Sequence, residues 1–207
     1  NSSADSRLPS GLQLGTGVRT AGTQKVFTTG SLEITDQPLD IAVNGRGFFQ
    51  IQMPDGNIGY TRDGTFHINN EGTVVNVNGY PLEPQIVIPE QTNNLTISED
   101  GIVQATMFGD PNPQQLGQIE TVDFINPAGL QAAGGNLFLE TAASGAPQGG
   151  VPGEDGFGRV VQGALENSNV EVVEELVKMI TVQRAYEMNS KVVSAADQML
   201  QFLTQNT

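Results

Sequence analysis

The chain has 207 residues with no Cys, no Trp, a single His (His67), and 23 acidic against 9 basic residues, which gives a formal net charge of −14. This charge disfavours DNA, RNA and anionic membranes as partners, because clustered Lys and Arg bind those. The lack of Cys excludes disulfides, thiolate metal sites and Cys nucleophiles. The sequence has neither a run of about 18 apolar residues that would span a bilayer nor the pattern of a cleavable signal peptide.

The first residues predict an extended arm. Residues 1–23 contain Gly11, Gly15, Gly17 and Gly22 but few large apolar side chains. Such a segment buries too little surface to offset its ordering entropy, so a disordered tail is the alternative. Because residue 1 is Asn rather than Met, we also expect a processed or incomplete chain.

Residues 24–166 predict a β-rich domain. Short runs of alternating or β-branched residues are separated by Asp-Gly and Asn-Gly pairs, which favour tight hairpin turns. The turn pairs are Asp55-Gly56, Asp63-Gly64, Glu71-Gly72, Asn78-Gly79 and Asp100-Gly101. The predicted strands are Leu39–Val43, Phe48–Met53, Thr65–Asn69, Thr73–Val77, Tyr80–Leu82, Gln85–Ile88, Leu95–Ser98, Ile102–Met107, Gly117–Phe124 and Asn136–Thr141. Regular short strands of this kind favour an irregular antiparallel sandwich or barrel.

Two segments of this region predict loops. Pro111 and Pro113 indicate a loop, because proline lacks the N–H that a sheet ladder needs. Residues 144–158 hold six Gly and two Pro, so we predict a long exposed loop there.

Residues 167–207 predict one long helix, so that the fold class is mainly β with a long C-terminal α-helix. Ser168 followed by Glu171 is a capping box that would open the helix, and no Gly or Pro follows Val170. About 36 residues at 1.5 Å each would extend roughly 54 Å, longer than a compact β domain can cover. We therefore predict coiled-coil-like assembly on a partner helix, and a core helix packed on the β domain is the alternative.

The predicted subunit interface is the apolar stripe of this helix together with Asn189, a polar residue that sets register. The spacing of the stripe slips between Ile180 and Val182, so it is not one continuous seam. Its members are Val173, Leu176, Val177, Ile180, Val182, Ala185, Tyr186, Asn189, Val192, Val193, Ala196, Met199, Leu200 and Leu203.

The remaining candidate sites favour structural roles, so we predict no catalytic, cofactor-binding or metal-binding residues. His67 fits an exposed strand position, and no second His or Cys accompanies it. Gly45-Arg46-Gly47 lacks the rest of a phosphate loop and favours a bend. The pairs Asp36/Asp40 and Glu154/Asp155 fit a solvated acidic surface better than a glycosidase site.

Three separated motifs resemble the rod and hook protein family of the bacterial flagellum. Ser168–Glu171, Glu174–Ile180 and Gln183–Lys191 resemble its C-terminal signature, and Asp40–Phe49 and Tyr60–Phe66 resemble its β-domain motifs. The Leu8–Arg19 stretch and Ala196–Leu200 are similar to members that build the distal rod. The family's N-terminal helix, which pairs with the C-terminal one, is absent from this sequence.

The resemblance implies a structural protein and not an enzyme, without cofactors. Such a subunit polymerises helically with itself into the drive shaft that crosses the periplasm and transmits torque to the hook. The resemblance further implies an outer β domain over 24–166 around an inner tube of terminal helices. Implied partners are neighbouring rod and hook proteins and the surrounding P- and L-ring proteins, with no membrane insertion. It also implies type III export without a cleaved signal peptide.

Two alternatives remain open at this point. The chain could be a hook or proximal rod subunit of the same family. It could instead be a carbohydrate-binding or hydrolytic β domain with a helical oligomerisation tail.

Overall fold

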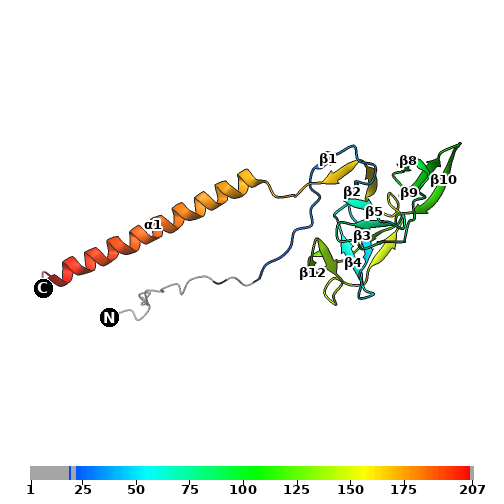
Figure 1. Ribbon diagram of the computed structural model, residues 1–207. Coiled ribbons are helices and arrows are strands. Elements are labelled where there is room, and N and C mark those ends of the chain that lie inside the picture. The colour runs from blue at the N-terminus through cyan, green and yellow to red at the C-terminus, as the bar shows by residue number, and fades with distance from the viewer. Residues whose placement is uncertain (1–18, 20–21, 206–207) are drawn as a thin grey trace, which may run out of the picture.

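A computed structural model describes residue 19 and residues 22–205 (Figure 1). It consists of a β-rich part, which we call the β region (residues 24–166), and a single long helix, α1 (Val172–Gln205). The predicted arm over residues 1–23 lies almost entirely outside the described residues. In Figure 1 the helix extends away from the β region instead of lying on it.

The β region is built from short strands and one 3₁₀ turn, η1 (Pro127–Gly129). The strands are β1 (Leu32–Ile34), β2 (Ile41–Asn44), β3 (Phe48–Gln52), β4 (Ile58–Thr61), β5 (Phe66–Ile68), β6 (Val74–Asn76), β7 (Leu82–Glu83), β8 (Thr92–Ile97), β9 (Ile102–Met107), β10 (Asp110–Gln118), β11 (Thr121–Asp123), β12 (Gln131–Gly134), β13 (Leu137–Leu139), β14 (Gln148–Gly150), β15 (Arg159–Gln162) and β16 (Ala164–Glu166).

All strand pairs in the described residues are antiparallel. The largest sheet has the order β12-β13-β4-β3-β11-β14, with β7 also paired to β3, and a second sheet has the order β10-β9-β8. The pairs β1-β16, β2-β15 and β5-β6 complete the set. The predicted fold class, mainly antiparallel β with a long C-terminal helix, is confirmed, and none of the sheets in the described residues closes into a barrel.

Two buried clusters hold the β region together. The larger includes Phe49, Ile51 and Phe66, and the smaller centres on Phe48 and Phe124. Edge-to-face ring pairs run through both, with centroids 5.3 Å apart for Phe49–Phe66 and 5.9 Å for Phe48–Phe124. Such pairs add to the stabilisation that burial itself provides.

The predicted turns occur, but one of them requires glycine for a different reason from the others. Gly56, Gly72, Gly79 and Gly101 have positive φ, as predicted for the glycines of these turn pairs. Gly64 does not, and there glycine is needed because a Cβ would overlap the carbonyl oxygen of Ile41.

Two predictions about the β region, one strand and one loop, are wrong. Gln85–Ile88 forms no named strand and contributes only an isolated bridge from Val87. Pro111 and Pro113 lie in β10 instead of in a loop. This is possible because β10 is an edge strand whose pairing with β9 shifts register over this stretch, where a missing N–H leaves no ladder partner unsatisfied.

The predicted exposed loop over 144–158 is interrupted by ordered structure. Ser144 is buried, and β14 adds an edge strand to β11. A Cβ on Gly150 would overlap the ring of Phe157, so glycine lets that ring lie against the strand. High glycine content here reflects close packing as well as exposure.

Helix α1 begins at Val172, not at the predicted capping box. The Ser168 hydroxyl accepts the Val170 N–H at 3.2 Å, and the Asn167 N–H donates to the Ser31 carbonyl at 2.8 Å. Residues 167–169 therefore continue alongside the incoming chain, and the helix starts only after they end. Its 34 residues extend about 51 Å at 1.5 Å each.

Candidate assembly interface

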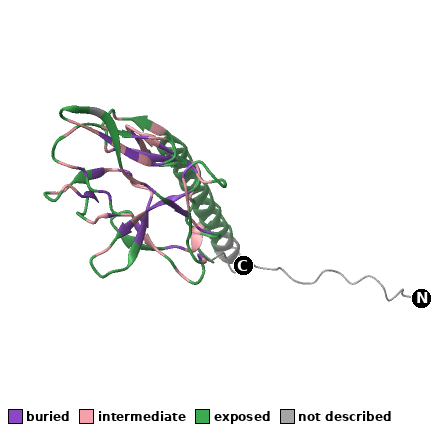
Figure 2. Cartoon of the chain, turned by 90° about the vertical axis from the view of Figure 1, so that its right-hand side faces the viewer, coloured by how far each residue is buried: buried purple, intermediate pink, exposed green. Residues whose placement is uncertain are grey.

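The predicted interface residues lie on α1 and are exposed to solvent. Figure 2 shows burial within the β region, whereas α1 is exposed along its described length. The exposed fraction ranges from 48% for Ile180 to 76% for Tyr186 among the large apolar residues of the predicted stripe. Leu200 and Leu203 lie in the same helix, but their side chains are outside the described part of the chain. The alternative of a core helix packed on the β domain is therefore wrong for this chain.

The apolar residues of α1 form two stripes rather than one. The first stripe is Val173, Leu176, Val177 and Ile180, with helical spacing of 3, 1 and 3 residues. The second stripe begins at Val182 and repeats every seven residues; it comprises Val182, Ala185, Tyr186, Asn189, Val192, Val193, Ala196 and Met199.

The two stripes lie on opposite sides of the helix. At about 100° per residue, the slip between Ile180 and Val182 places the second stripe roughly 180° around from the first. The side opposite the first stripe carries Lys178, and the side opposite the second carries Arg184 and Lys191. A single partner on one side would leave one stripe exposed, so the arrangement fits a helix that has neighbours on two sides.

Charged residues at the start of α1 complement the helix. Glu174 and Glu175 lie in the first turn, where negative charge faces the positive end of the helix dipole. Lys178 forms ion pairs with Glu174 at 3.0 Å and Glu175 at 2.9 Å. The hydrogen bonds that the Lys178 ammonium donates to Glu175 and then to Glu174 raise the pKa of Lys178 above its ordinary value. The Glu174–Lys178 pair has the i, i+4 spacing with the acid on the N-terminal side, which is the order that supports an exposed helix.

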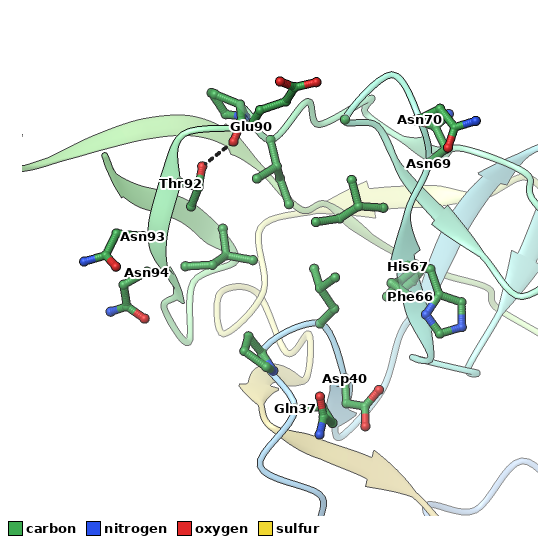
Figure 3. Close-up of a pocket in the computed structure, with 17 residues that line it drawn as sticks. Gln37, Asp40, Phe66, His67, Asn69, Asn70, Glu90, Thr92, Asn93 and Asn94 are labelled. Atoms are coloured by element: carbon green, nitrogen blue, oxygen red, sulfur yellow. Dashed lines mark hydrogen bonds between the residues drawn. The ribbon is translucent and has the colours of Figure 1, made fainter. Parts of the chain in front are cut away.

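His67 is exposed on β5, as predicted, while its neighbour Phe66 is buried. Alternation along the strand predicts that Ile68 faces inward like Phe66, but Ile68 is half exposed. His67 lines an open cavity of about 890 Å³, shown in Figure 3, whose other side carries Asn93 and Asn94 of β8.

Of the two acidic pairs considered in the sequence, only Asp40 is held by the fold. Asp40 is buried, and its Oδ2 accepts the Thr35 hydroxyl at 2.6 Å, while Asp36 is exposed. Glu154 and Asp155 are also exposed. Within the described residues no group of three or more His, Asp or Glu is placed to hold a metal ion.

Gly45-Arg46-Gly47 forms the predicted bend, with φ of 125° at Gly45 and 137° at Gly47. The carbonyl oxygens of both glycines accept hydrogen bonds from Nη1 of Arg62, at 2.9 Å and 2.8 Å. A phosphate loop instead presents N–H groups to its ligand. The bend therefore serves to hold Arg62.

Sequence reasoning did not single out the residues at the base of α1. Arg62, Glu166 and Asn169 connect the two ends of the β region, and the separation of Arg62 from Glu166 is 104 residues. In the sequence, Arg62 is distinguished only by its place in the Tyr60–Phe66 motif. An arginine and a glutamate this far apart in the sequence leave no local pattern from which their pairing could be predicted.

None of the helices in the described residues is long and apolar enough to cross a membrane. Two family models match the chain: the flagellar hook protein FlgE/F/G D1 domain over residues 42–105, and the flagellar basal body rod FlgEFG protein C-terminal over residues 161–206. The first covers much of the β region, and the second covers its last strands together with α1.

Relatives match over most of the chain. The flagellar basal-body rod protein FlgG of Buchnera aphidicola subsp. Schizaphis graminum is 52% identical over 205 residues, covering 99% of this chain and 79% of that protein. FlgG of Caulobacter vibrioides is 48% identical, covering 99% and 78%. The rod protein FlgF of Salmonella typhimurium is 34% identical over 177 residues, covering 83% and 69%. The chain therefore belongs to the family of flagellar hook and basal-body rod proteins.

Proposed function

We propose that this chain is a structural subunit of the distal rod of the flagellar basal body. In this proposal it polymerises helically through α1 into the drive shaft that transmits torque across the periplasm to the hook. The observation that carries the proposal is the exposure of both apolar stripes of α1. Isolated helices are marginally stable in water, and most helical stability in proteins comes from packing an apolar face. A helix that leaves its apolar residues uncovered therefore needs other helices.

The two stripes support a tube of helices in particular. A helix inside a closed layer has a neighbour on each side, and α1 offers apolar residues to each side at different heights. Burying one large aliphatic side chain contributes about 1.5–3 kcal/mol, so covering both stripes would stabilise each subunit strongly. A head-to-tail contact that does not close on itself produces a filament.

The domain division follows from this role. We propose that residues 24–166 form the outer layer of the rod, residues 167–207 the assembly segment, and residues 1–23 an arm between neighbours. The proposed interface consists of the stripe residues, Asn189 included. The strand pairing that ends at Glu166 supports a boundary there.

The proposed surroundings follow from the family. The partners are other copies of this chain, neighbouring rod and hook proteins, and the P- and L-ring proteins around the shaft. The location is the basal body, with export by the flagellar type III system and no cleaved signal peptide. The proposed role involves no catalysis.

The choice of the distal rod over the hook or proximal rod rests on the relatives. Identity to proteins named FlgG ranges from 52% in Buchnera aphidicola to 36% in Bacillus subtilis, against 34% to FlgF of Salmonella typhimurium. The FlgG proteins also match over a longer part of the chain than FlgF does. Both comparisons support an FlgG-like role.

Electron microscopy of basal bodies tests the proposal. Cells whose distal rod subunit contains this whole chain should build complete rods. Cells carrying a chain that ends at Glu171 should build none, although its β region still folds, as judged by thermal unfolding. Complete rods built from the shortened chain would refute assembly through α1.

A further inference from the structure

The two ends of the β region leave it together. β1 pairs antiparallel with β16, with Leu32 opposite Glu166, and the Asn167 N–H extends the ladder to Ser31 at 2.8 Å. A Cβ on Gly30 would overlap the Asn167 carbonyl oxygen, so the two chains lie in close backbone contact. Figure 1 shows residues 22–30 and α1 leaving the β region on the same side.

Glu166 joins both strands to the body of the β region. Its Oε1 accepts the Gly30 N–H at 2.9 Å, and its Oε2 accepts Nε–H of Arg62 at 2.7 Å. The side chains of Arg62 and Glu166 are only 17% and 10% exposed. A charge-assisted hydrogen bond of this kind is short and strong, and partial burial reduces its screening.

Arg62 is itself held in one orientation. Beyond Glu166, it donates to the carbonyl oxygens of Gly45, Gly47 and Val43 at 2.9, 2.8 and 3.0 Å. Its guanidinium lies 5.9 Å from the centroid of the Phe48 ring. The planar fork of arginine satisfies these directions at once, which a lysine could not do.

Asn169 makes a second connection nearer the helix. Its Nδ2 donates to the carbonyl oxygens of Val26 and Thr28 at 3.2 and 3.0 Å, and to the Thr28 hydroxyl at 2.9 Å. The incoming segment is anchored in turn, because the Phe27 ring packs edge-on against Phe48 and Phe138, with centroids 5.6 and 5.2 Å away.

We propose that Arg62, Glu166 and Asn169 form a clasp of positioning residues that fixes the direction in which α1 leaves the β region. Only Val170 and Glu171 separate Asn169 from the first residue of the helix, too few to act as a flexible linker. The helix and the β region then move as one body. Resting on the proposed function, the clasp is the route by which torque passes between the inner and outer layers of the rod.

Distance measurement by electron paramagnetic resonance tests the clasp in the full-length chain. The chain has no Cys, so spin labels attach only at introduced sites. We choose the exposed residues Gln52 in β3 and Gln183 in α1, each changed to Cys. Dilution of the doubly labelled chain with unlabelled chain removes distances between molecules.

The expected result is a narrow distance distribution in the otherwise unaltered chain. Asn169→Ala should widen it about twofold, because the linking segment then gains conformational freedom. Asn169→Gln, which keeps the amide donor, should restore part of the narrowness. Asn93→Ala, an exposed asparagine on the rim of the cavity, is the matched control and should change nothing.

Glu166→Gln provides a second variant, since it removes the charge that Arg62 faces and should also widen the distribution. If that variant fails to fold, Asn169→Ala alone decides, because its exposed side chain makes no core contact. A distribution equally wide with and without Asn169 would overturn the clasp. The measurement needs no assembled rod, so a narrow distribution in a chain that never builds rods would refute only the proposed function.

Discussion

The β region and α1 use the same kinds of apolar side chain and treat them in opposite ways. Phe49, Ile51 and Leu82 are fully buried inside the β region, whereas Leu176, Ile180 and Met199 on α1 are about half exposed or more. The difference shows that one part of the molecule completes its own core and the other does not. Stability measured on the isolated chain should therefore depend on the β region, and assembly should depend on α1.

The largest contrast is expected from core truncation. Phe49→Ala removes a ring that has no exposure and packs 5.3 Å from Phe66, so the free energy of unfolding should fall by about 3–5 kcal/mol. Tyr186→Ala on α1 should change unfolding of the β region by less than about 0.5 kcal/mol. Urea unfolding, followed by the circular dichroism of the β-sheets, measures the free energy of unfolding of both variants. Equal losses would mean that α1 packs on the β region after all.

Breaking the Arg62–Glu166 pair comes next. Arg62→Met leaves Glu166 buried without its partner, and the expected loss is about 3 kcal/mol, the lower end of the range for a buried pair because some exposure remains. Arg159→Met removes the ion pair with Glu99 at 2.7 Å, but both partners are exposed, so at most about 1 kcal/mol should be lost. The same unfolding measurement separates the two, and similar values would argue against a tightly held clasp.

A smaller effect is expected at the point where the chain ends meet. Gly30→Ala should cost about 1–3 kcal/mol, because the added carbon overlaps the Asn167 carbonyl and forces the strands apart. Gly149→Ala is the control, since a Cβ there meets nothing within 4 Å. Thermal unfolding compares them, and an unchanged midpoint for Gly30→Ala would contradict the close contact.

The smallest effect concerns alkaline pH. Burial, and then the charge of Glu140, raise the pKa of Tyr60 above its ordinary value of 10.0. The folded state thus disfavours the tyrosinate, so stability is fully present below pH 10 and falls as pH rises toward the folded-state pKa. Tyr60→Phe should therefore lose less stability than the unaltered chain as the pH rises above 10, measured by thermal unfolding at successive pH values. If the stability of the two chains fell in parallel as the pH rises, the raised pKa of Tyr60 would be contradicted.

Much of this architecture follows from local patterns. The hairpin turns at Gly56, Gly72, Gly79 and Gly101 and the long helix were predicted because turn chemistry and helical spacing are read over a few residues. The interface residues of α1 were predicted for the same reason, although their role in assembly stays a prediction. The change in apolar spacing between Ile180 and Val182 is also visible in the sequence. In a helix this change places the two stripes on opposite sides.

Other features depend on contacts between distant residues. β1 and β16 are three residues each and lie more than 120 residues apart, so neither shows a pattern of its own. Helix α1 starts at Val172 instead of at the predicted Ser168, because Asn167 and Asn169 form hydrogen bonds with the incoming chain. Pro111 fits in a strand only because that strand lies at an edge. In each case tertiary contacts outweighed a local preference.

The most direct test of the central claim is one pair of substitutions at neighbouring positions of α1. Met199→Asp places a charge in the second stripe, and Gln198→Asp adds the same charge on the opposite, polar side of the helix. Met199 is 70% exposed in the isolated chain, so neither change should alter thermal unfolding of the β region. In basal bodies examined by electron microscopy, we expect Gln198→Asp to build complete rods and Met199→Asp to build none, because a buried unpaired charge is costly only after assembly. Complete rods from Met199→Asp would contradict assembly through this face of α1.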